Sequence, residues 1–487
     1  MALVIMVKWI LQRENSVQNG ILVLLILKAK GARALEVNTN TYREQTLFNI
    51  SWPLFIELTL HMGMGIIATL MLSHYADDAA AGVGVANQLL NIFILVFNVT
   101  SIGATVLISQ NLGAGRFQKA RQLSHSVCGL NFWFGIAVGI VVFCFGEHLL
   151  RLFDIHGKVL EYGLIFTRIC GISLFFESLS QALSAVLRSH GYVKEAMAVT
   201  VMMDLISVGG NIIATTDIFG LPVTGVTGVS WAILAARAFA VMALLYFVYN
   251  RLSLKLGFND ILTTKKDDIK GLLSIGIPSA GENLSYQLSQ LVITSIVVSI
   301  GAASLAARVY ILNINMVCYL FTLAIAQGTQ LLVARYIGGR KFDQALRRGL
   351  RTLKIAMAAS TLTSLFIALV GSPLLKTFTK NPEIIAVGLP VLWAIVFVEP
   401  GRAMNIVLMS SLKSAGDVRF PVIIGIISMW GVAVTLSYFL GVYLNLGLLG
   451  VWLAQGTDEW LRGIFALKRW LAKPWESKMT VEKTTSI

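Results

Sequence analysis

Long apolar runs recur along this chain, and short segments between them hold most of the charged residues. A helix that crosses the hydrocarbon core of a bilayer needs ~20 mostly apolar residues, and these runs reach that length. The pattern therefore predicts membrane-spanning helices. We expect twelve spans, at residues 48–72, 79–108, 123–146, 159–186, 195–218, 223–248, 271–299, 303–332, 350–372, 384–411, 420–441 and 446–468.

Composition supports this interpretation. Hydrophobic residues make up 56% of the 487 residues and charged residues only 13%, which is more apolar surface than a soluble domain of this length needs to fill its core. We predict an all-α polytopic membrane protein. The run ILVLLIL (21–27) is too short to span, so residues 1–46 are expected to form a cytoplasmic N-terminal extension.

The net charge of +14 raises the question of a nucleic-acid partner. The cations, however, lie between the apolar runs, where the positive-inside rule accounts for them without a polyanion. We therefore expect no nucleic-acid partner, both termini in the cytoplasm, and a multi-pass position in the plasma (inner) membrane. Examples are Arg116, Lys119 and Arg121 after the second span, Arg188 and Lys194 after the fourth, Arg340 and Lys341 after the eighth, and Lys413 and Arg419 after the tenth.

The chain repeats itself at a constant offset. Pro53 matches Pro278 and Glu57 matches Glu282, so that position n of the first half aligns with position n + 225. The loop GAGRFQKA (113–120) falls on GGRKFDQA (338–345), and LRSHGYVK (187–194) falls on LKSAGDVR (412–419) at the same offset. Near the end the offset shifts to 222, where GVSWA (228–232) fits GVWLA (450–454).

The repeat predicts two six-helix bundles. Each half has an even number of spans, so both begin on the same side of the membrane and form a parallel repeat. Transporters built this way hold a substrate between the halves; a duplicated structural bundle without transport is the alternative. The expected domains are an N-terminal lobe (47–250), a cytoplasmic linker (251–270), a C-terminal lobe (271–468) and a cytoplasmic tail (469–487).

Glu57 and Glu282 each follow a proline by four residues near the start of an apolar run. A carboxylate at membrane depth costs at least ~2.5 kcal/mol and usually marks an ion or substrate path. Proline frees backbone carbonyls that can share a cation with the nearby acid. Each half therefore carries one candidate proton or cation site. The alternative is an acid near the interface that caps its helix.

Glu177 and Arg402 are related by the same offset. Opposite charges at equivalent positions predict a gate in which the two side chains meet between the halves. The alternative is that each is neutralised within its own half, Arg402 by Glu399 one turn earlier.

Three further polar residues are candidates for binding the coupling ion or the substrate. Gln88 and Asn313 match in the repeat and could line a cavity or form hydrogen bonds between helices. Asp204 could bind an ion or pair locally. His61, one turn after Glu57, could complete a coupled proton site.

The segment DEWLR (458–462) is expected to anchor the last span at the interface, with Trp470 and Trp475 at headgroup level. No GxxxxGK[ST] loop occurs, so ATP is not expected to drive this chain, and no catalytic residues are predicted. Nor is a metal site or cofactor predicted, because the histidines and cysteines lack ligand spacing.

Twelve spans in two halves, a proline near the start of spans one and seven, the basic loops 113–120 and 338–345, and LRSHG and LKSAGD together resemble the multidrug and toxic compound extrusion (MATE) family. The resemblance covers about residues 45 to 470. It implies an antiporter driven by H⁺ or Na⁺ that exports organic, often cationic amphipathic compounds through a cavity between the lobes.

The chain departs from that family at coupling positions. Members often have an aspartate before threonine in span one, where this chain has Ala68 before Thr69. Frequent acids of spans ten and seven correspond here to Arg402 and Tyr286. Glu57 and Glu282 are expected to replace them, and H⁺ is favoured over Na⁺ because the extra acids that would hold a hard cation are absent.

Two other functions compete with drug export. A flippase of lipid-linked saccharides would need a basic cavity, for which Arg168, Arg237, Arg308 and Arg402 are candidates. A lipid-modifying membrane enzyme would need a cluster of His, Asp or Ser at a helix end, and none is apparent. We expect a monomer that engages a small-molecule substrate, a coupling ion and the bilayer.

Overall fold

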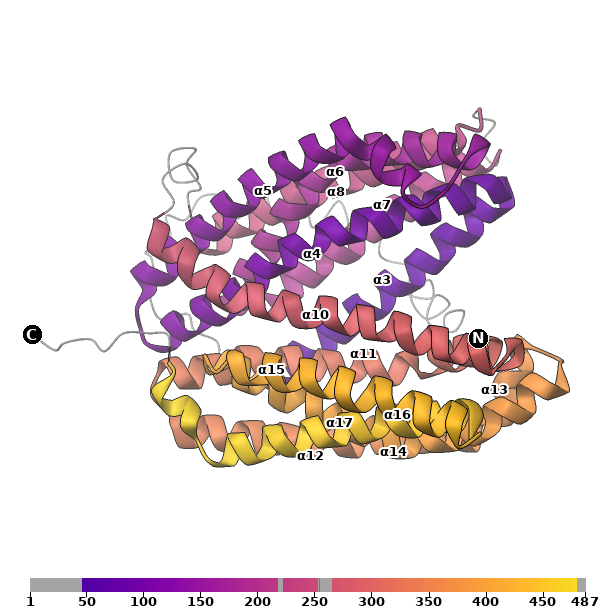
Figure 1. Ribbon diagram of the computed structural model, residues 1–487. Coiled ribbons are helices and arrows are strands. Elements are labelled where there is room, and N and C mark those ends of the chain that lie inside the picture. Colours follow the sequence, from indigo (N-terminus) through magenta and orange to yellow (C-terminus); the bar gives the residue numbers. More distant parts are fainter. Residues whose placement is uncertain (1–45, 218–221, 253, 255–264, 480–487) are drawn as a thin grey trace, which may run out of the picture. The chain divides into compact units, whose positions relative to one another are not determined.

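The structure is a computed structural model that describes residues 46–217, 222–252, 254 and 265–479. All regular elements within these ranges are helices (Figure 1). The first half contains α3 (Leu47–Tyr75), α4 (Asp77–Gly113), α5 (Phe117–Arg151), α6 (Gly157–Ser189), α7 (Val193–Thr215) and α8 (Gly225–Leu252).

The second half repeats this order with additional breaks. Its elements are α10 (Lys266–Ile300), α11 (Ala302–Gly338), α12 (Phe342–Leu369), the short α13 (Gly371–Phe378), α14 (Pro382–Ser414), α15 (Arg419–Ser428), η1 (Met429–Val434), α16 (Thr435–Tyr438), η2 (Phe439–Tyr443), α17 (Gly447–Leu471) and η3 (Pro474–Ser477). The eleventh predicted span is thus one continuous rod of α15, η1, α16 and η2, in which η1 and η2 are π-helical. Such π-helical turns often occur at functional sites.

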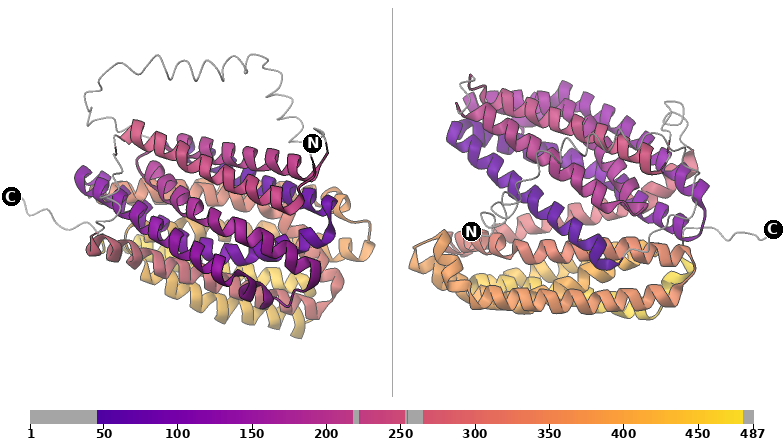
Figure 2. Two further views of the ribbon diagram at one scale, coloured as in Figure 1. Left: turned by 90° about the horizontal axis from the view of Figure 1, so that it is seen from above. Right: turned by 180° about the vertical axis from the view of Figure 1, so that it is seen from behind.

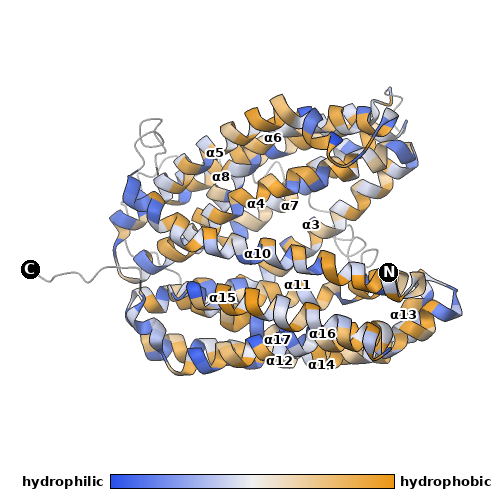
Figure 3. Cartoon of the chain, in the orientation of Figure 1, coloured by the Kyte–Doolittle hydropathy of each residue, from blue (hydrophilic) through white to orange (hydrophobic). Residues whose placement is uncertain are grey.

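The predicted all-α polytopic class with twelve spans is confirmed. In the described residues, eleven helical segments are long and apolar enough to cross a membrane, with Arg419–Tyr443 counted as one. The twelfth long helix, α17, is more polar because it carries Asp458, Glu459 and Arg462. Figure 3 shows hydrophilic residues mainly at the helix ends and apolar residues between them.

Several helices begin earlier than hydropathy predicts. The third begins at Phe117 rather than residue 123, and the ninth at Phe342 rather than residue 350. Their first turns are polar but bury Ala120 and Ala345. Such an amphipathic first turn is helical, but its mean hydropathy is too low for a search for apolar runs to include it in the span.

Each half forms its own bundle. In the first, α6 packs against α4, α5 and α8; in the second, α14 packs against α11, α12 and α17 (Figure 2). α6 and α14 are equivalent in the repeat, so the same helix is central in both bundles. The predicted extension over residues 1–46 lies outside the described residues, except for Thr46, whose hydroxyl caps α3 by accepting from the Asn49 amide at 3.3 Å.

The first helix of each half begins against the other half, so that its first turns pack in the other half's core. Leu47 and Ile50 of α3 lie in a core formed mainly by the second half. Leu272 and Ile275 of α10 lie in a core formed mainly by the first half. These turns lie at the end of the bundle where α4 leads to α5, α6 to α7, α11 to α12 and α14 to α15. We call this the basic end, after the cations of those loops.

Reciprocal contacts join the halves at the basic end. Gln110 Nε2 of α4 donates to the Ser414 carbonyl oxygen at 2.7 Å, and Arg335 Nη2 of α11 donates to the Ser189 carbonyl oxygen at 2.6 Å. Gln110 and Arg335 are repeat-related, as are Ser189 and Ser414. The crossing of α4 and α11 requires glycine, because a Cβ on Gly338 would lie 1.8 Å from the Gln110 carbonyl oxygen.

Candidate functional site: buried ion pairs in the two halves

The two predicted carboxylates each have a basic partner in their own half. Glu57 of α3 is buried, and its Oε1 accepts a hydrogen bond from Arg188 Nη2 in the last turn of α6. Glu282 of α10 lies 2.6 Å (Oε2 to Nζ) from Lys413 in the last turn of α14. Arg188 and Lys413 match at the same offset as the two glutamates, so the two ion pairs are related by the repeat.

These pairs tie the first helix of each half to its fourth. A proton or Na⁺ that binds Glu57 or Glu282 competes with a cation already in place. Sequence reasoning assigned Arg188 and Lys413 only to the positive-inside pattern, although their shared offset with the two glutamates was the signal for pairing.

The structure does not bring Glu177 and Arg402 together. Glu177 Oε2 lies 3.2 Å from Arg237 Nε of α8. Arg402 pairs with Glu399 on its own helix and with Glu459 Oε1, 3.4 Å from its Nε, on α17. Each is neutralised within its own half, which was the alternative that the sequence left open.

Those two ion pairs are equivalent but reversed in polarity. Arg237 matches Glu459 at the offset of 222, which relates α8 to α17. The fourth helix contributes the acid in the first half and the base in the second. In the first half the sixth helix contributes the base, Arg237, and in the second half it contributes the acid, Glu459. An ion pair between the fourth and sixth helices is therefore present in both halves.

The pair in the second half belongs to a larger group of buried side chains. We call Glu399, Arg402, Asp458, Glu459 and Arg462 the charged cluster. Asp458 and Glu459 are 2% and 6% exposed, and Glu399 is fully buried. Arg462 pairs with Asp458 and, at 3.5 Å between Nη2 and Oε2, with Glu459. Three carboxylates face two guanidinium groups, which leaves one formal negative charge.

Neutral donors from three helices complete the charged cluster. Asn315 Nδ2 of α11 donates to Glu399 Oε1 at 2.7 Å, and Asn405 Nδ2 of α14 donates to Glu459 Oε2 at 2.7 Å. Ser428, the last residue of α15, donates to Asp458. The π-helical η1 begins directly after this serine, so the break in regular helix lies beside the cluster.

Glu399 Oε2 differs from the other carboxylate oxygens of the cluster. It is buried and has no hydrogen-bond partner among the described residues. Both oxygens of Asp458 and both of Glu459 accept hydrogen bonds or ion pairs. The place where this cluster can accept one more proton without displacing a donor is therefore Glu399 Oε2.

The prediction that DEWLR anchors the last span at the interface is wrong. Asp458 and Arg462 lie in the buried cluster, in the middle of α17. Trp470 and Trp475 are fully buried in protein at the end of α17, stacked with ring centroids 4.5 Å apart, and their position at headgroup level stays a prediction. The chain folds back after Leu471, and Lys473 pairs with Asp343 at 2.8 Å (Nζ to Oδ1), which closes this apolar corner.

The remaining candidates occupy separate places. Asp204 of α7 lies 3.1 Å (Oδ1 to Nδ1) from His61 of α3, so His61 pairs with Asp204 and not with Glu57. Gln88 of α4 and Asn313 of α11 are exposed, and Asn313 Nδ2 donates to the Val309 carbonyl oxygen of its own helix at 2.8 Å. Their role in lining a cavity stays a prediction.

Comparison with known proteins identifies the family. The MatE family model matches residues 53–213 and again residues 278–439, once in each half. The chain belongs to the MatE family. The two matches begin at Pro53 and Pro278, the prolines that reveal the internal repeat.

Relatives and solved structures agree with this MatE assignment. The uncharacterized transporter YisQ of Bacillus subtilis is 39% identical over 433 residues, which cover 89% of this chain and 95% of YisQ. The "Probable multidrug resistance protein NorM" of Thermotoga maritima is 24% identical over 438 residues, 90% of this chain and 94% of that protein. A solved outward-facing multidrug resistance MATE transporter of the MOP superfamily has a TM-score of 0.80 at 19% identity and covers 88% of this chain and 95% of its own; it shares the fold.

Proposed function

We propose that this MatE protein is a proton-coupled antiporter that exports organic cations by alternating access. The observation that carries the proposal is the charged cluster, whose single excess negative charge lies inside the second half. An uncompensated buried charge is costly, so the cluster favours binding one cation. The names of its NorM relatives support multidrug export as the activity.

H⁺ fits the charged cluster better than Na⁺. A hard metal cation needs several oxygen ligands at once. Here the carboxylate oxygens other than Glu399 Oε2 are engaged by Arg402, Arg462 and neutral donors. A proton needs only that one oxygen, and its uptake leaves two carboxylates facing two guanidinium groups.

The basic end supports an alternating-access cycle. Gln110, Arg335 and the first turns of α3 and α10 close that end between the halves. By the positive-inside rule we place it at the cytoplasmic face of the plasma membrane, so this arrangement is the one closed to the cytoplasm. Proton binding at Glu399 would weaken its contacts with Arg402 and Asn315, the two groups that donate to it. Arg402 also donates to Glu459, next to Asp458, which accepts from Ser428 at the start of η1, so the change would shift the equilibrium between conformations of this π-helical segment.

The competing flippase hypothesis loses much of its basis. Three of the four arginines that favoured a basic cavity have acidic partners: Arg237 with Glu177, Arg402 with Glu399, and Arg168 with Glu147 at 4.0 Å. Arg308 is 5% exposed, forms no ion pair within the described residues, and donates to Gln290 Oε1 at 2.9 Å. One buried guanidinium is a weak site for a pyrophosphate.

Ethidium efflux tests the proposal. Cells that express the chain should expel ethidium, efflux should stop when the pH gradient is collapsed, and removal of the Na⁺ gradient should leave it unchanged. Glu399→Gln should abolish gradient-driven efflux. The Glu57→Gln and Glu282→Gln variants test the competing candidate sites. A folded, inserted protein that moves no organic cation but moves a lipid-linked anion would overturn the proposal in favour of the flippase.

A further inference from the structure

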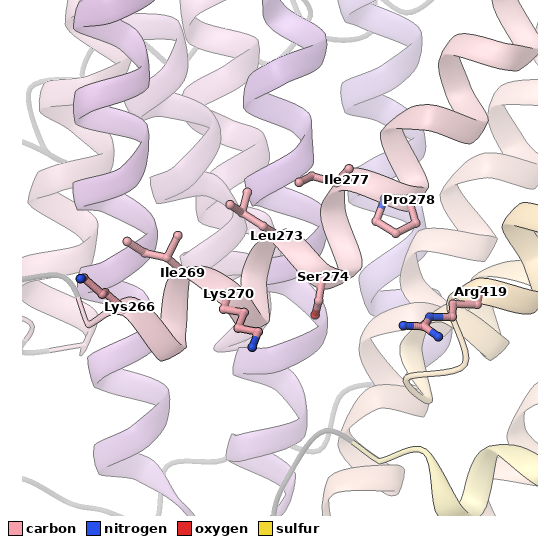
Figure 4. A pocket seen from close by; sticks show the side chains of 8 residues that line it. All are labelled: Lys266, Ile269, Lys270, Leu273, Ser274, Ile277, Pro278 and Arg419. Atoms are coloured by element: carbon pink, nitrogen blue, oxygen red, sulfur yellow. The ribbon is translucent and has the colours of Figure 1, made fainter.

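A groove at the basic end has the chemistry of a lipid headgroup site. It has a volume of about 630 Å³ and lies between the first turns of α10 and the start of α15 (Figure 4). It is lined by Lys266, Ile269, Lys270, Leu273, Ser274, Ile277, Pro278 and Arg419.

The lining changes from basic to apolar along α10. Lys266 and Lys270 are one turn apart on one face, and Leu273 and Ile277 continue that stripe toward the middle of the helix. Figure 4 shows the Lys270 ammonium and the Ser274 hydroxyl on the side of α10 where Arg419 lies, whereas Leu273 and Ile277 point to the other side in this view. Ile277 is 58% exposed, which leaves an apolar track open beside the cations.

The three cations of the groove form no ion pair with any other part of the chain that the structure describes. The nearby buried acid, Asp268, faces the other way: it pairs with Lys119 of α5, and Gln122 Nε2 donates to it at 2.7 Å. The positive charge of the groove is therefore left for an external anion. Basic pockets between helices on the cytoplasmic side bind anionic lipid headgroups, whose acyl chains cover apolar residues below.

We propose that this groove binds an anionic phospholipid, with its phosphate among Lys266, Lys270 and Arg419 and an acyl chain along Leu273 and Ile277. The binding does not depend on the proposed transport activity. A soluble phosphate would use the cations alone, whereas the apolar track fits a membrane lipid.

The bound lipid would join the two halves. The start of α10 is held to the first half by Asp268 and Lys119, while Arg419 begins α15 in the second half. One phosphate between Lys270 and Arg419 therefore stabilises the closed basic end. Anionic lipid should raise the share of molecules closed at this end.

Lipid binding to the purified full-length protein provides the test. Native mass spectrometry should show retained phosphatidylglycerol and little phosphatidylcholine. The triple variant Lys266→Gln, Lys270→Gln, Arg419→Gln should bind phosphatidylglycerol on the order of 100-fold more weakly, at about 1 kcal/mol per cation. A control removes three exposed cations of α12, Arg347→Gln, Arg351→Gln and Lys354→Gln, of which Arg347 and Arg351 have the same i, i+4 spacing as Lys266 and Lys270, and it should bind as wild type.

The opposing results are distinct. Equal binding of both lipids, or equal loss in the α12 control, would show nonspecific charge attraction and overturn the site. Thermal stabilisation by glycerol 3-phosphate as large as that by the lipid would assign the groove to a soluble phosphate. Circular dichroism of both triple variants should match wild type, because all six side chains lie at the surface.

Discussion

Glu177 and Arg402 occupy equivalent positions in the two halves, carry opposite charges, and are each neutralised inside their own half. The repeat has kept an ion pair between its fourth and sixth helices while reversing the polarity. The pair therefore matters as a link between helices, and the excess charge of the second half comes from the groups added around it, the acids Glu399 and Asp458 against the single base Arg462.

Reversing the pair of the first half should be tolerated. Glu177→Arg alone places two guanidinium groups side by side and should lower thermal stability by several degrees. Adding Arg237→Glu reproduces the arrangement of the second half and should recover most of the loss. Unfolding midpoints in detergent measure this, and a double variant no more stable than the single would show that polarity is fixed by something besides the pair.

The pairs of Glu57 and Glu282 should act as structural ties. Glu282→Gln leaves Lys413 without its carboxylate partner and should lower the free energy of unfolding by about 1–3 kcal/mol. Glu57→Gln should behave alike, because Arg188 is its equivalent partner. Thermal unfolding checks this. Glu147→Gln is the control: it breaks an exposed pair with Arg151 and should leave the unfolding midpoint nearly unchanged.

The glycine crossing at the basic end gives a third prediction. Gly338→Ala forces α4 and α11 apart and should weaken closure of the basic end, seen as faster labelling of a cysteine introduced at Ser414. Gly65→Ala is the matched control, since a Cβ there has no atom within 4 Å. If both variants label at the wild-type rate, the close approach of Gly338 and Gln110 is not needed for closure.

His190 should give the fold a specific pH dependence. It lies between α6 and α7, and burial lowers its pKa to about 4. The unfolded chain binds this proton near pH 6.5 and the folded one does not, so the stability from neutral His190 is present above pH 6.5 and is lost as the pH falls toward 4. His190→Gln should flatten the decrease in unfolding midpoint between pH 7 and 4.5. An unchanged slope would assign the acid sensitivity to other groups.

Sequence alone predicted the helices and the parallel repeat, and it offered the local pairing of Arg402 with Glu399 as the alternative to the predicted gate. Apolar runs and a fixed offset are visible along the chain, and partners one turn apart follow from helix geometry. The pairing of Glu57 with Arg188 and of Glu282 with Lys413 joins residues 131 positions apart. The repeat offset shows that the four positions correspond, but packing is needed to show that the partners meet.

The charged cluster was missed for a related reason. Asp458 and Arg462 form a helical i, i+4 pair, a pattern typical of an exposed or interfacial surface. Their burial depends on Ser428, Asn405 and Arg402 arriving from other helices. A local pattern does not show whether its surroundings are water, lipid or protein.

In the proposed transport cycle, Glu399 is the group that exchanges a proton against substrate. The most direct measurement is proton release by the purified protein in weak buffer when ethidium is added. Wild type should release about one proton per bound dye, and Glu399→Gln should bind dye while releasing none. Proton release by Glu399→Gln equal to wild type, with its loss in Glu57→Gln or Glu282→Gln instead, would contradict the account and place coupling at the proline-linked glutamates.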